Sequence, residues 1–455
     1  MQETEQRGDF RNLWILFLPL VGTTFCNYLF QLLEKLFLAR VSKEAMEAAL
    51  NATYACQIFQ MATLALVMMA QVSVARWYSA KQWSVIGPGV WQFIWFSLLS
   101  MLLTVPCSLL YGNWYFRGME IETAALSYFY IFTAFSFLYP LGASLSCFFL
   151  GMGKIRLVLL ATLADQGIKI LLCYLFIFGI NPWIPPQGLL GGVMSNLVAQ
   201  ALLCLVFGVI FLQKKNRDIY HSHHWKFRIP LFWSSIKPGL FRALNRLFSF
   251  GSWLMIARLM NAKGGDHLLF ISLGGTLTLF IPFLFEAIYQ SQTIVVSQLL
   301  GANKIASLFK AARSGLILVG AIIILVSFPF LGFSSFTFER LFPDIFLDPA
   351  SIRMVFFGVW LWFAYFTLAA IPLSYIFAFK DTQFYSYLGI VFCVTDYFLM
   401  QFFVNQVGIA PKFFWITLSL VQMTNTIPIY FWRMNVLCKR ALKNRNRDQL
   451  TIPIH

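Results

Sequence analysis

Two short stretches, Ala75-Arg-Trp-Tyr-Ser-Ala-Lys81 and Ser297-Gln-Leu-Leu-Gly-Ala-Asn-Lys304, each close a long apolar run, and Ala80 and Ala302 lie 222 positions apart. Each run is the second in a set of six. Nearly the same offset, 218 and 223 positions, relates Leu38–Val41 to Ile256–Leu259 and Cys173–Tyr174 to Asp396–Tyr397. Membrane proteins built from two related halves are often secondary transporters, with a binding site between the repeats. The repeat therefore favours a transporter.

The composition is typical of a membrane protein. Of 455 residues, 59% are hydrophobic and 11% are charged, with a mean hydropathy of +0.72. About twelve runs reach the ~20 residues that cross a bilayer, and none alternates as a membrane strand would. The runs are Asn12–Arg40, Met46–Trp77, Ile86–Gly112, Thr123–Leu150, Leu157–Ile180, Gly188–Gln213, Ser234–Asn261, His267–Leu300, Ala312–Phe333, Ser351–Ala378, Phe384–Val407 and Lys412–Met434. We predict an all-α membrane protein whose helices form two pseudo-symmetric six-helix bundles.

These runs divide the chain into an N-lobe (1–213), a linker (214–233), a C-lobe (234–440) and a basic tail (441–455). The linker carries His221, His223 and His224. A metal site needs three or four ligands held in a fixed geometry, and the linker offers neither cysteine nor a rigid frame. We therefore expect a solvated basic loop there, and no metal or cofactor.

The net charge of +16 follows the expected topology. Most lysines and arginines fall on one side of a twelve-span arrangement, and the positive-inside rule places that side, with both termini, in the cytoplasm. The polar first dozen residues lack the apolar core of a signal peptide. We expect a multi-pass protein of the cytoplasmic membrane, a monomer, with the lipid bilayer as partner and no nucleic-acid partner.

Several motif classes are missing from the sequence. It has no nucleotide-binding P-loop, no Cys/His metal pattern and no acidic run, and seven of its eight cysteines lie inside predicted spans, where they serve as small packing residues. A membrane-embedded enzyme would need paired acids or a similar cluster at helical spacing, and none is visible. An ion gradient is then the energy source for any active transport, and we do not expect an enzyme.

The order of motifs resembles the multidrug and toxic compound extrusion (MATE) family, within a superfamily that includes oligosaccharide-lipid flippases. The resemblance runs through the whole chain. It is carried by Gly151-Met-Gly-Lys-Ile-Arg156, Tyr174-Leu-Phe-Ile-Phe-Gly179, Gln187-Gly-Leu-Leu-Gly-Gly192, Gln298-Leu-Leu-Gly-Ala-Asn-Lys304 and Lys380-Asp-Thr382. It implies twelve spans around a central V-shaped cavity and export by alternating access, with the first span bending at Pro19.

The resemblance also implies a cation site in the N-lobe. Glu34 stands where the family usually has an aspartate, and the family's span-five asparagine maps to Lys169. The acid or amide one turn later maps to Cys173, and the span-six threonine maps to Asn196. Of the acidic positions only the carboxylate of Glu34 is kept, and Lys169 stands near it. Because the positive charge of a lysine repels a second cation, a sodium site is disfavoured and proton coupling is expected.

Buried charges in the predicted spans need a partner or a function, since each costs about 2.5–3.5 kcal/mol at mid-membrane. Glu34 is a protonatable coupling group, a structural partner of Lys169, or part of an interfacial Glu34/Lys35 doublet that extends outward to the membrane surface. Lys169 is either a cavity cation or half of an intrahelical pair with Asp165, four residues before it.

The C-lobe carries further charges. Arg246 occupies a position at which some relatives have a cation-binding glutamate, and Glu286 is a plausible partner for it. Arg242, one turn earlier, suits the cytosolic interface. Asp396 is either a second protonatable site or a satisfied buried acid.

We expect a proton-coupled antiporter that exports small, drug-like organic compounds, cationic or amphipathic. The alternative is a flippase for an anionic lipid-linked or polyanionic substrate. Such flippases favour cationic cavities, and three basic residues are consistent with this alternative: Lys169, Arg242 and Arg246. The two-lobe repeat disfavours a channel.

Overall fold

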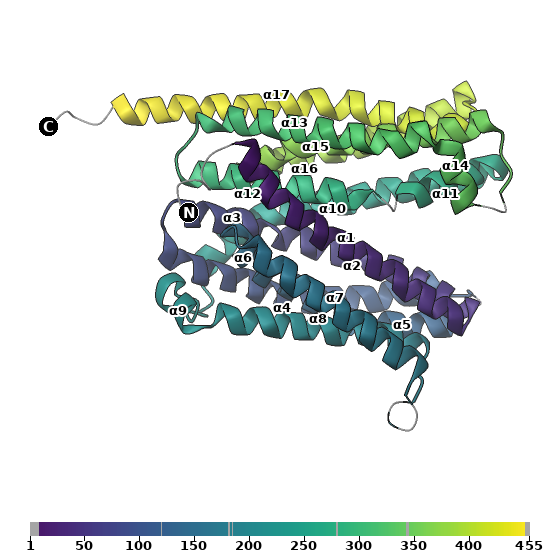
Figure 1. Cartoon of the computed structure of the whole chain (residues 1–455), viewed down its shortest axis with the longest axis horizontal. Coiled ribbons are helices and arrows are strands. Elements are labelled where there is room, and N and C mark those ends of the chain that lie inside the picture. Colours follow the sequence, from purple (N-terminus) through teal and green to yellow (C-terminus); the bar gives the residue numbers. More distant parts are fainter. Residues whose placement is uncertain are drawn as a thin grey trace. The chain divides into compact units, whose positions relative to one another are not determined.

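The computed structural model describes residues 9–119, 121–180, 183, 185–278, 281–342 and 345–450. Helices joined by short turns make up nearly all of this part of the chain (Figure 1). In the first half they are α1 (Phe10–Val41), α2 (Lys43–Val67), α3 (Met69–Ser79), α4 (Trp83–Phe116), α5 (Glu122–Ala134), α6 (Leu138–Gly151), α7 (Ile155–Phe178), α8 (Leu189–Phe211) and α9 (Lys214–Tyr220). In the second half they are α10 (Ile229–Lys263), α11 (Gly265–Thr278), α12 (Pro282–Gly301), α13 (Ser307–Ser327), η2 (Phe328–Gly332), α14 (Ser334–Leu341), α15 (Pro349–Ala378), α16 (Thr382–Phe402), η3 (Phe403–Val407), η4 (Pro411–Phe413) and α17 (Phe414–Leu450).

Helices stand at all twelve predicted positions. Within the described residues, eight are long and apolar enough to cross a membrane, counting α2 with α3, α13 with η2 and α16 with η3 as single spans. Two bent pairs raise the number to ten: α5 with α6, bent by 41°, and α11 with α12, bent by 49°. The remaining two predicted spans coincide with the long helices α10 and α17. The predicted all-α fold class is confirmed.

The structure divides into two compact units. The N-unit comprises Gly22–Leu247, and the C-unit comprises the chain up to Val21 together with Phe248 onward. The boundaries fall inside α1, two residues after Pro19, and inside α10, whereas the sequence analysis divided the chain at the linker 214–233. The first part of α1 thus belongs to the C-unit and the first part of α10 to the N-unit.

Small residues bring the N-unit helices close together. Along α2 a stripe of alanines is buried at helical spacing: Ala45, Ala48, Ala49, Ala52 and Ala55. Because alanine adds little bulk, the aromatic rings of Phe116, Tyr128 and Phe129 pack against this stripe in one apolar cluster. The cluster lies between α2, α4 and α5, and α7 packs along α8 in the same unit (Figure 1).

The C-unit is centred on α15, which packs against α12, α13 and α17 (Figure 1). The fully buried indole of Trp415 fills the space beside α11, and its Nε1 donates a hydrogen bond to the carbonyl of Phe270 at 3.0 Å. A Cβ atom at Gly274 would lie 1.9 Å from that Nε1. Glycine is therefore required at position 274 for this packing.

One turn geometry recurs four times. Lys81, Gly153, Asn303 and Lys380 follow the second, fourth, eighth and tenth spans, and each has a φ between 54° and 78°. In each turn the next residue's amide donates to the carbonyl five positions earlier at 2.9 Å, as in Gln82 to Trp77. This closes the helix with a Schellman-type cap. The Ala75–Lys81 and Ser297–Lys304 repeat therefore corresponds to one backbone structure.

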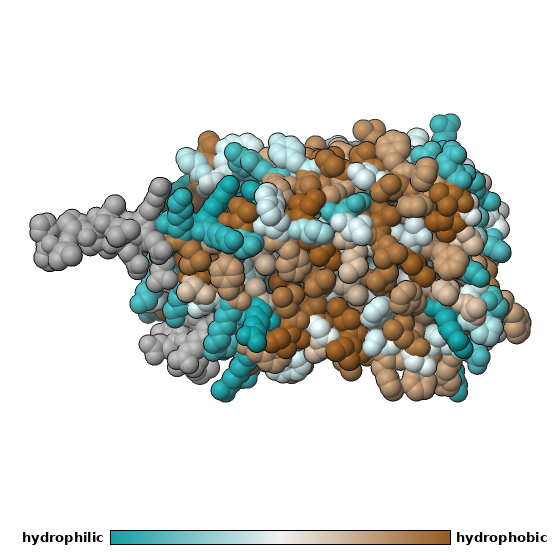
Figure 2. All heavy atoms as spheres, turned by 90° about the horizontal axis from the view of Figure 1, so that it is seen from above, coloured by the Kyte–Doolittle hydropathy of each residue, from teal (hydrophilic) through white to brown (hydrophobic). Residues whose placement is uncertain are grey.

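The surface carries a broad apolar band. On the face shown in Figure 2, hydrophobic side chains cover the middle of the helices and hydrophilic ones gather toward their ends. Leu102, Leu110 and Ile324 are each more than 70% exposed. Large apolar side chains facing outward are expected where lipid, rather than water, surrounds the helices.

Candidate functional site

Glu34 lies on α1 inside the N-unit, with 7% of its surface exposed. The hydroxyl of Tyr128 on α5 donates to its Oε1 at 3.1 Å, and Nδ2 of Asn196 on α8 donates to its Oε2 at 3.1 Å. Within the described residues Glu34 has no ion-pair partner closer than 4 Å. Two neutral donors from two other helices therefore hold the carboxyl group.

Lys169 on α7 pairs with Asp165 rather than with Glu34. Its Nζ lies 2.8 Å from Oδ2 of Asp165, one turn earlier on the same helix, and both side chains are almost fully buried. Of the two alternatives for Lys169, the structure has the intrahelical pair. Lys169 still acts electrostatically on Glu34, as does Lys35.

A second polar contact connects this pair to α1. Nε2 of Gln166 donates to Oδ1 of Asn27 at 2.8 Å and lies 3.3 Å from Oδ2 of Asp165. Oδ1 of Asp165 and Oε1 of Gln166 are buried without a hydrogen-bond partner. Cys173, one turn beyond Lys169, is fully buried in the apolar cluster that also contains Tyr128.

The C-unit buries a different carboxyl group. Asp396 on α16 is 6% exposed, and Nδ2 of Asn425 on α17 donates to its Oδ1 at 3.4 Å. Glu286 on α12 accepts a hydrogen bond from Nε2 of Gln290 at 2.8 Å. Arg246 belongs to the N-unit and Glu286 to the C-unit, so the two expected partners fall in different units. The guanidinium of Arg246 contacts Sδ of Met61 at 4.0 Å.

Pro19 lies inside α1, which continues as a helix on both sides of it. Proline in a helix interior removes one backbone hydrogen bond. The position is two residues before the unit boundary at Val21. The geometry thus places the weakest backbone point of α1 next to the place where the helix passes from one unit to the other.

Sequence reasoning missed Tyr128 as a partner of Glu34, and Gln166 with Asn27 as a neighbouring polar pair. Tyrosine is common throughout the chain and span four carries no charge at this depth, so no local signal distinguished Tyr128. Within the described residues no group of three His, Cys, Asp or Glu side chains could hold a metal ion. The polar groups of the N-unit site are thus one carboxyl, one hydroxyl and one amide, beside an internal ion pair.

Comparisons with known proteins agree with this fold. The MatE family model matches residues 19–175. No curated protein matches the sequence. Among solved structures, an outward-facing multidrug resistance MATE family transporter of the MOP superfamily is 16% identical, with a TM-score of 0.82 over 95% of this chain and 98% of that chain. The eukaryotic MATE transporter AtDTX14 is also 16% identical, with a TM-score of 0.82 over 98% and 99% of the two chains.

A third similar structure is a MOP superfamily transporter from Pyrococcus furiosus, for which the reverse polarity of the binding pocket suggests a different function. It is 16% identical, with a TM-score of 0.79 over 95% of this chain and 97% of that chain. At such identities these structures establish the shared fold, while the family match supplies the sequence evidence. The protein therefore has the fold of the MATE transporters, a multi-pass membrane fold, and its residues 19–175 match the MatE family model.

Proposed function

We propose that this protein is a transporter and not an enzyme: an antiporter of the cytoplasmic membrane that exports small organic compounds in exchange for protons. The MatE match and the shared fold support this proposal. Glu34 is the proton-carrying group. The proposal rests on one observation: a buried carboxyl group on α1 is held by Tyr128 and Asn196 without an ion-pair partner. Both termini face the cytoplasm and the protein acts as a monomer.

Protonation of Glu34 changes the contacts of α1. An ionised carboxyl group only accepts hydrogen bonds, whereas a protonated one also donates. When the carboxyl group takes up a proton, it becomes a weaker acceptor for the hydrogen bond from Tyr128 on α5 or from Asn196 on α8. The hydrogen-bonded connection between α1, α5 and α8 is then weaker. Pro19 gives α1 a place to bend in response. The bending moves the part of α1 that belongs to the other unit, which is the conformational change that alternating access requires.

The environment of Glu34 suits a proton better than a sodium ion. Sodium requires several oxygen ligands, and Asn196 already presents its nitrogen to the carboxyl group. The positive charges of Lys35 and Lys169 act on Glu34 and oppose a second cation. A proton needs no such coordination shell.

Transport in proteoliposomes tests the proposal. An imposed pH gradient at constant sodium should drive uptake of a cationic dye by the wild type, and Glu34→Gln should abolish it. Pro19→Ala should slow transport and alter its pH dependence, because the hinge is lost. Transport that follows a sodium gradient at fixed pH and ignores a proton gradient would refute proton coupling.

The second candidate is export of an anionic, lipid-linked substrate. Arg242 and Arg246 favour it, since both are basic residues within a predicted span of the N-unit. The likeness to the Pyrococcus furiosus transporter, for which the reverse polarity of the binding pocket suggests a different function, supports keeping this second candidate. Counterflow with matched cationic and anionic dyes separates the two candidates, because only the preferred charge should exchange.

A further inference from the structure

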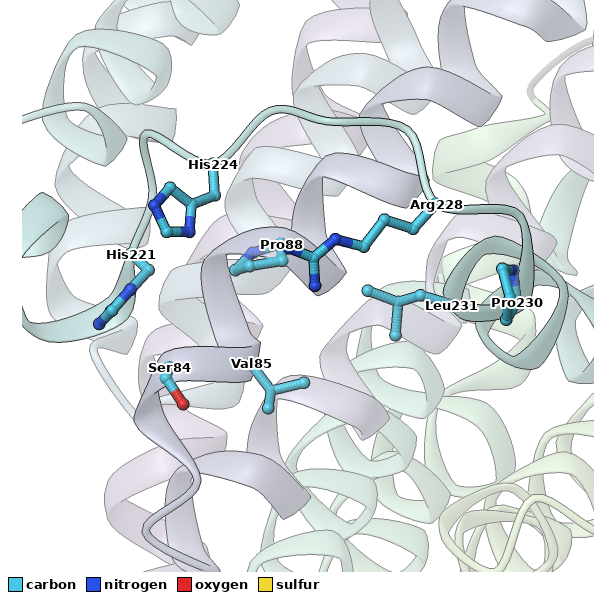
Figure 3. A pocket seen from close by; sticks show the side chains of 8 residues that line it. All are labelled: Ser84, Val85, Pro88, His221, His224, Arg228, Pro230 and Leu231. Carbon is cyan, nitrogen blue, oxygen red and sulfur yellow. The ribbon is translucent and has the colours of Figure 1, made fainter.

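The linker between the two predicted lobes borders an open surface pocket of about 670 Å³. All of its lining residues belong to the N-unit, and Figure 3 shows them: Ser84, Val85, Pro88, His221, His224, Arg228, Pro230 and Leu231. They come from the beginning of α4, from the linker and from the beginning of α10. The volume lies within the usual range for small-molecule sites, about 300–1,000 Å³.

Hydrogen bonds to α4 hold the backbone of the linker in place, while its residues 223–230 are exposed to solvent, as expected from the sequence. Trp91 and Trp95 donate from their indole nitrogens to the carbonyls of Ser222 and Trp225 at 2.7 and 2.8 Å. Gln92, fully buried, donates to the carbonyl of Lys226 at 3.2 Å and accepts from the backbone amide of Arg228 at 3.2 Å. The backbone that carries Arg228 is therefore fixed before the pocket receives any ligand.

The end of α9 is packed just as closely. A Cβ atom at Gly87 of α4 would lie 2.4 Å from the carbonyl oxygen of Tyr220. Only glycine allows the two backbones to approach this closely. His221, which follows, has a φ of 54° and ends α9 in the left-handed conformation. The wall of the pocket formed by the linker is thus anchored at both of its ends.

The polar lining of the pocket is positively charged. Arg228 reaches back over Pro88, and the imidazoles of His221 and His224 lie beside it (Figure 3). No acidic residue lines the pocket. His224 is exposed, and slight desolvation, followed by the neighbouring charges of His223, His221, Arg228 and Lys226, lowers its pKa. A bound anion would relieve this repulsion.

We propose that this pocket binds the phosphate group of a phosphomonoester, held by Arg228 together with His221 and His224. A phosphate presents oxygens in several directions and suits several separate donors, whereas a carboxylate has two coplanar oxygens. The apolar side chains that also line the pocket, Val85, Pro88 and Leu231, pack against the carbon part of the ligand. The phosphate comes either from a lipid headgroup at the membrane surface or from a soluble metabolite. The site is independent of the proposed transport mechanism.

Clustered imidazoles can also bind a metal ion, which is the alternative ligand for this pocket. The rings of His223 and His224 are 4.2 Å apart and those of His221 and His224 are 5.2 Å apart. Within the described residues, however, no three such side chains are arranged to hold a metal. Arg228 at the same pocket adds a positive charge that would repel a cation. The chemistry of the lining therefore favours an anion.

The test measures binding to the purified full-length protein in uncharged detergent, by calorimetry at constant ionic strength. The probes are inorganic phosphate, glycerol 3-phosphate, dioctanoyl phosphatidic acid and, as a zwitterionic lipid, dioctanoyl phosphatidylcholine. Arg228→Gln should weaken phosphate binding at least about tenfold, because a charged hydrogen-bond donor is lost. Lys226→Gln removes one charge from the same linker but none from the pocket, and should change binding less than about twofold.

Acidification from pH 8 to pH 6 should strengthen binding, since protonated histidines attract the anion, and His224→Gln should reduce this gain. Phosphatidic acid binding at least about tenfold tighter than glycerol 3-phosphate identifies the lipid source, and comparable binding identifies the soluble one. The proposal is overturned by no binding at millimolar concentration, by equal binding to wild type and Arg228→Gln, or by an equal loss in Lys226→Gln.

Discussion

Glu34 in the N-unit and Asp396 in the C-unit are both buried carboxyl groups held by neutral donors, but they connect different numbers of helices. Glu34 on α1 is bonded from α5 and from α8. Asp396 on α16 is bonded by Asn425 and Gln422, both of which lie on α17. A change at Glu34 therefore affects three helices, one of which enters the other unit, whereas a change at Asp396 affects two neighbouring helices. If Glu34 is the coupling group, the number of helices that a buried carboxyl group connects matters as well as its burial.

The largest expected effect is a difference in transport between variants of Glu34 and variants of Asp396. Glu34→Gln should lower proton-driven dye transport at least about tenfold, because an amide cannot take up the proton. Asp396→Asn should lower it less than about threefold, since the amide preserves a polar contact with α17. Initial rates in proteoliposomes under an imposed pH gradient provide the measurement. If Asp396→Asn proves the more damaging change, the C-unit carries the coupling group and the comparison must be reversed.

A second contrast concerns ion pairs. The N-unit pair between Lys169 and Asp165 is almost fully buried, whereas Arg433 and Asp381 of the C-unit, at 2.7 Å, remain partly exposed. Lys169→Met leaves an unpaired buried carboxylate and should lower the free energy of unfolding by about 3–5 kcal/mol. Arg433→Met should lower it by about 1.5–3 kcal/mol.

Unfolding in mixed detergent micelles, followed by tryptophan fluorescence, measures both losses. The double variant Asp165→Leu/Lys169→Met is the control and should recover most of the lost stability, because no charge is left unpaired. A double variant as unstable as Lys169→Met would mean that packing, rather than charge, is responsible for the loss.

The units also differ in how they accommodate large aromatic rings. The N-unit places alanines against its rings, whereas the C-unit places Gly274 against Trp415. Gly274→Ala should lower the free energy of unfolding by about 1–3 kcal/mol, because the added methyl group overlaps the indole. Gly275→Ala, with nothing within 4 Å of its added Cβ, is the matched control and should be neutral or slightly stabilising. Similar melting temperatures for the two variants would contradict the contact.

The smallest expected effect concerns the left-handed turns, which have the same backbone geometry in both units. Lys81 and Asn303 occupy equivalent left-handed positions, at φ of 58° and 54°. Glycine adopts this conformation without strain, so Lys81→Gly should stabilise the protein by up to about 1 kcal/mol. Asn303→Gly should gain less, because asparagine tolerates this region better than lysine. Thermal unfolding of the two variants side by side measures the difference, and destabilisation by Lys81→Gly would show that its side chain makes a contact that outweighs the strain.

The sequence predicted the helices well because each span is a continuous apolar run whose length is set by the bilayer. It did not predict the bends. The fourth span breaks between Ala134 and Leu138, at Phe135-Ser136-Phe137, which contains neither proline nor glycine. A break of this kind depends on packing with neighbouring helices, which no local pattern records. The unit boundaries inside α1 and α10 were not predicted either, because each helix continues without a break across its boundary.

The candidate site was predicted in part. The position of Asn196 beside Glu34 followed from the resemblance, and the structure joins them at 3.1 Å. Tyr128 was missed, since a neutral aromatic residue in an apolar span carries no signal of its own. The linker is exposed, as expected, but its attachment to α4 through backbone carbonyls was not predicted. Hydrogen bonds from Trp91 and Trp95 to those carbonyls have no signature in the linker sequence.

The four left-handed turns at Lys81, Gly153, Asn303 and Lys380 can serve as fixed reference points for aligning other sequences with this chain. Their residue identities differ, since lysine, glycine and asparagine all occur there, but their backbone hydrogen bonds are the same. A remote homologue can be placed in register by locating these four helix ends, even where almost no side chains match. An insertion then changes the number of residues between two successive turns. It can be assigned to the helices between those turns before any side chain is compared.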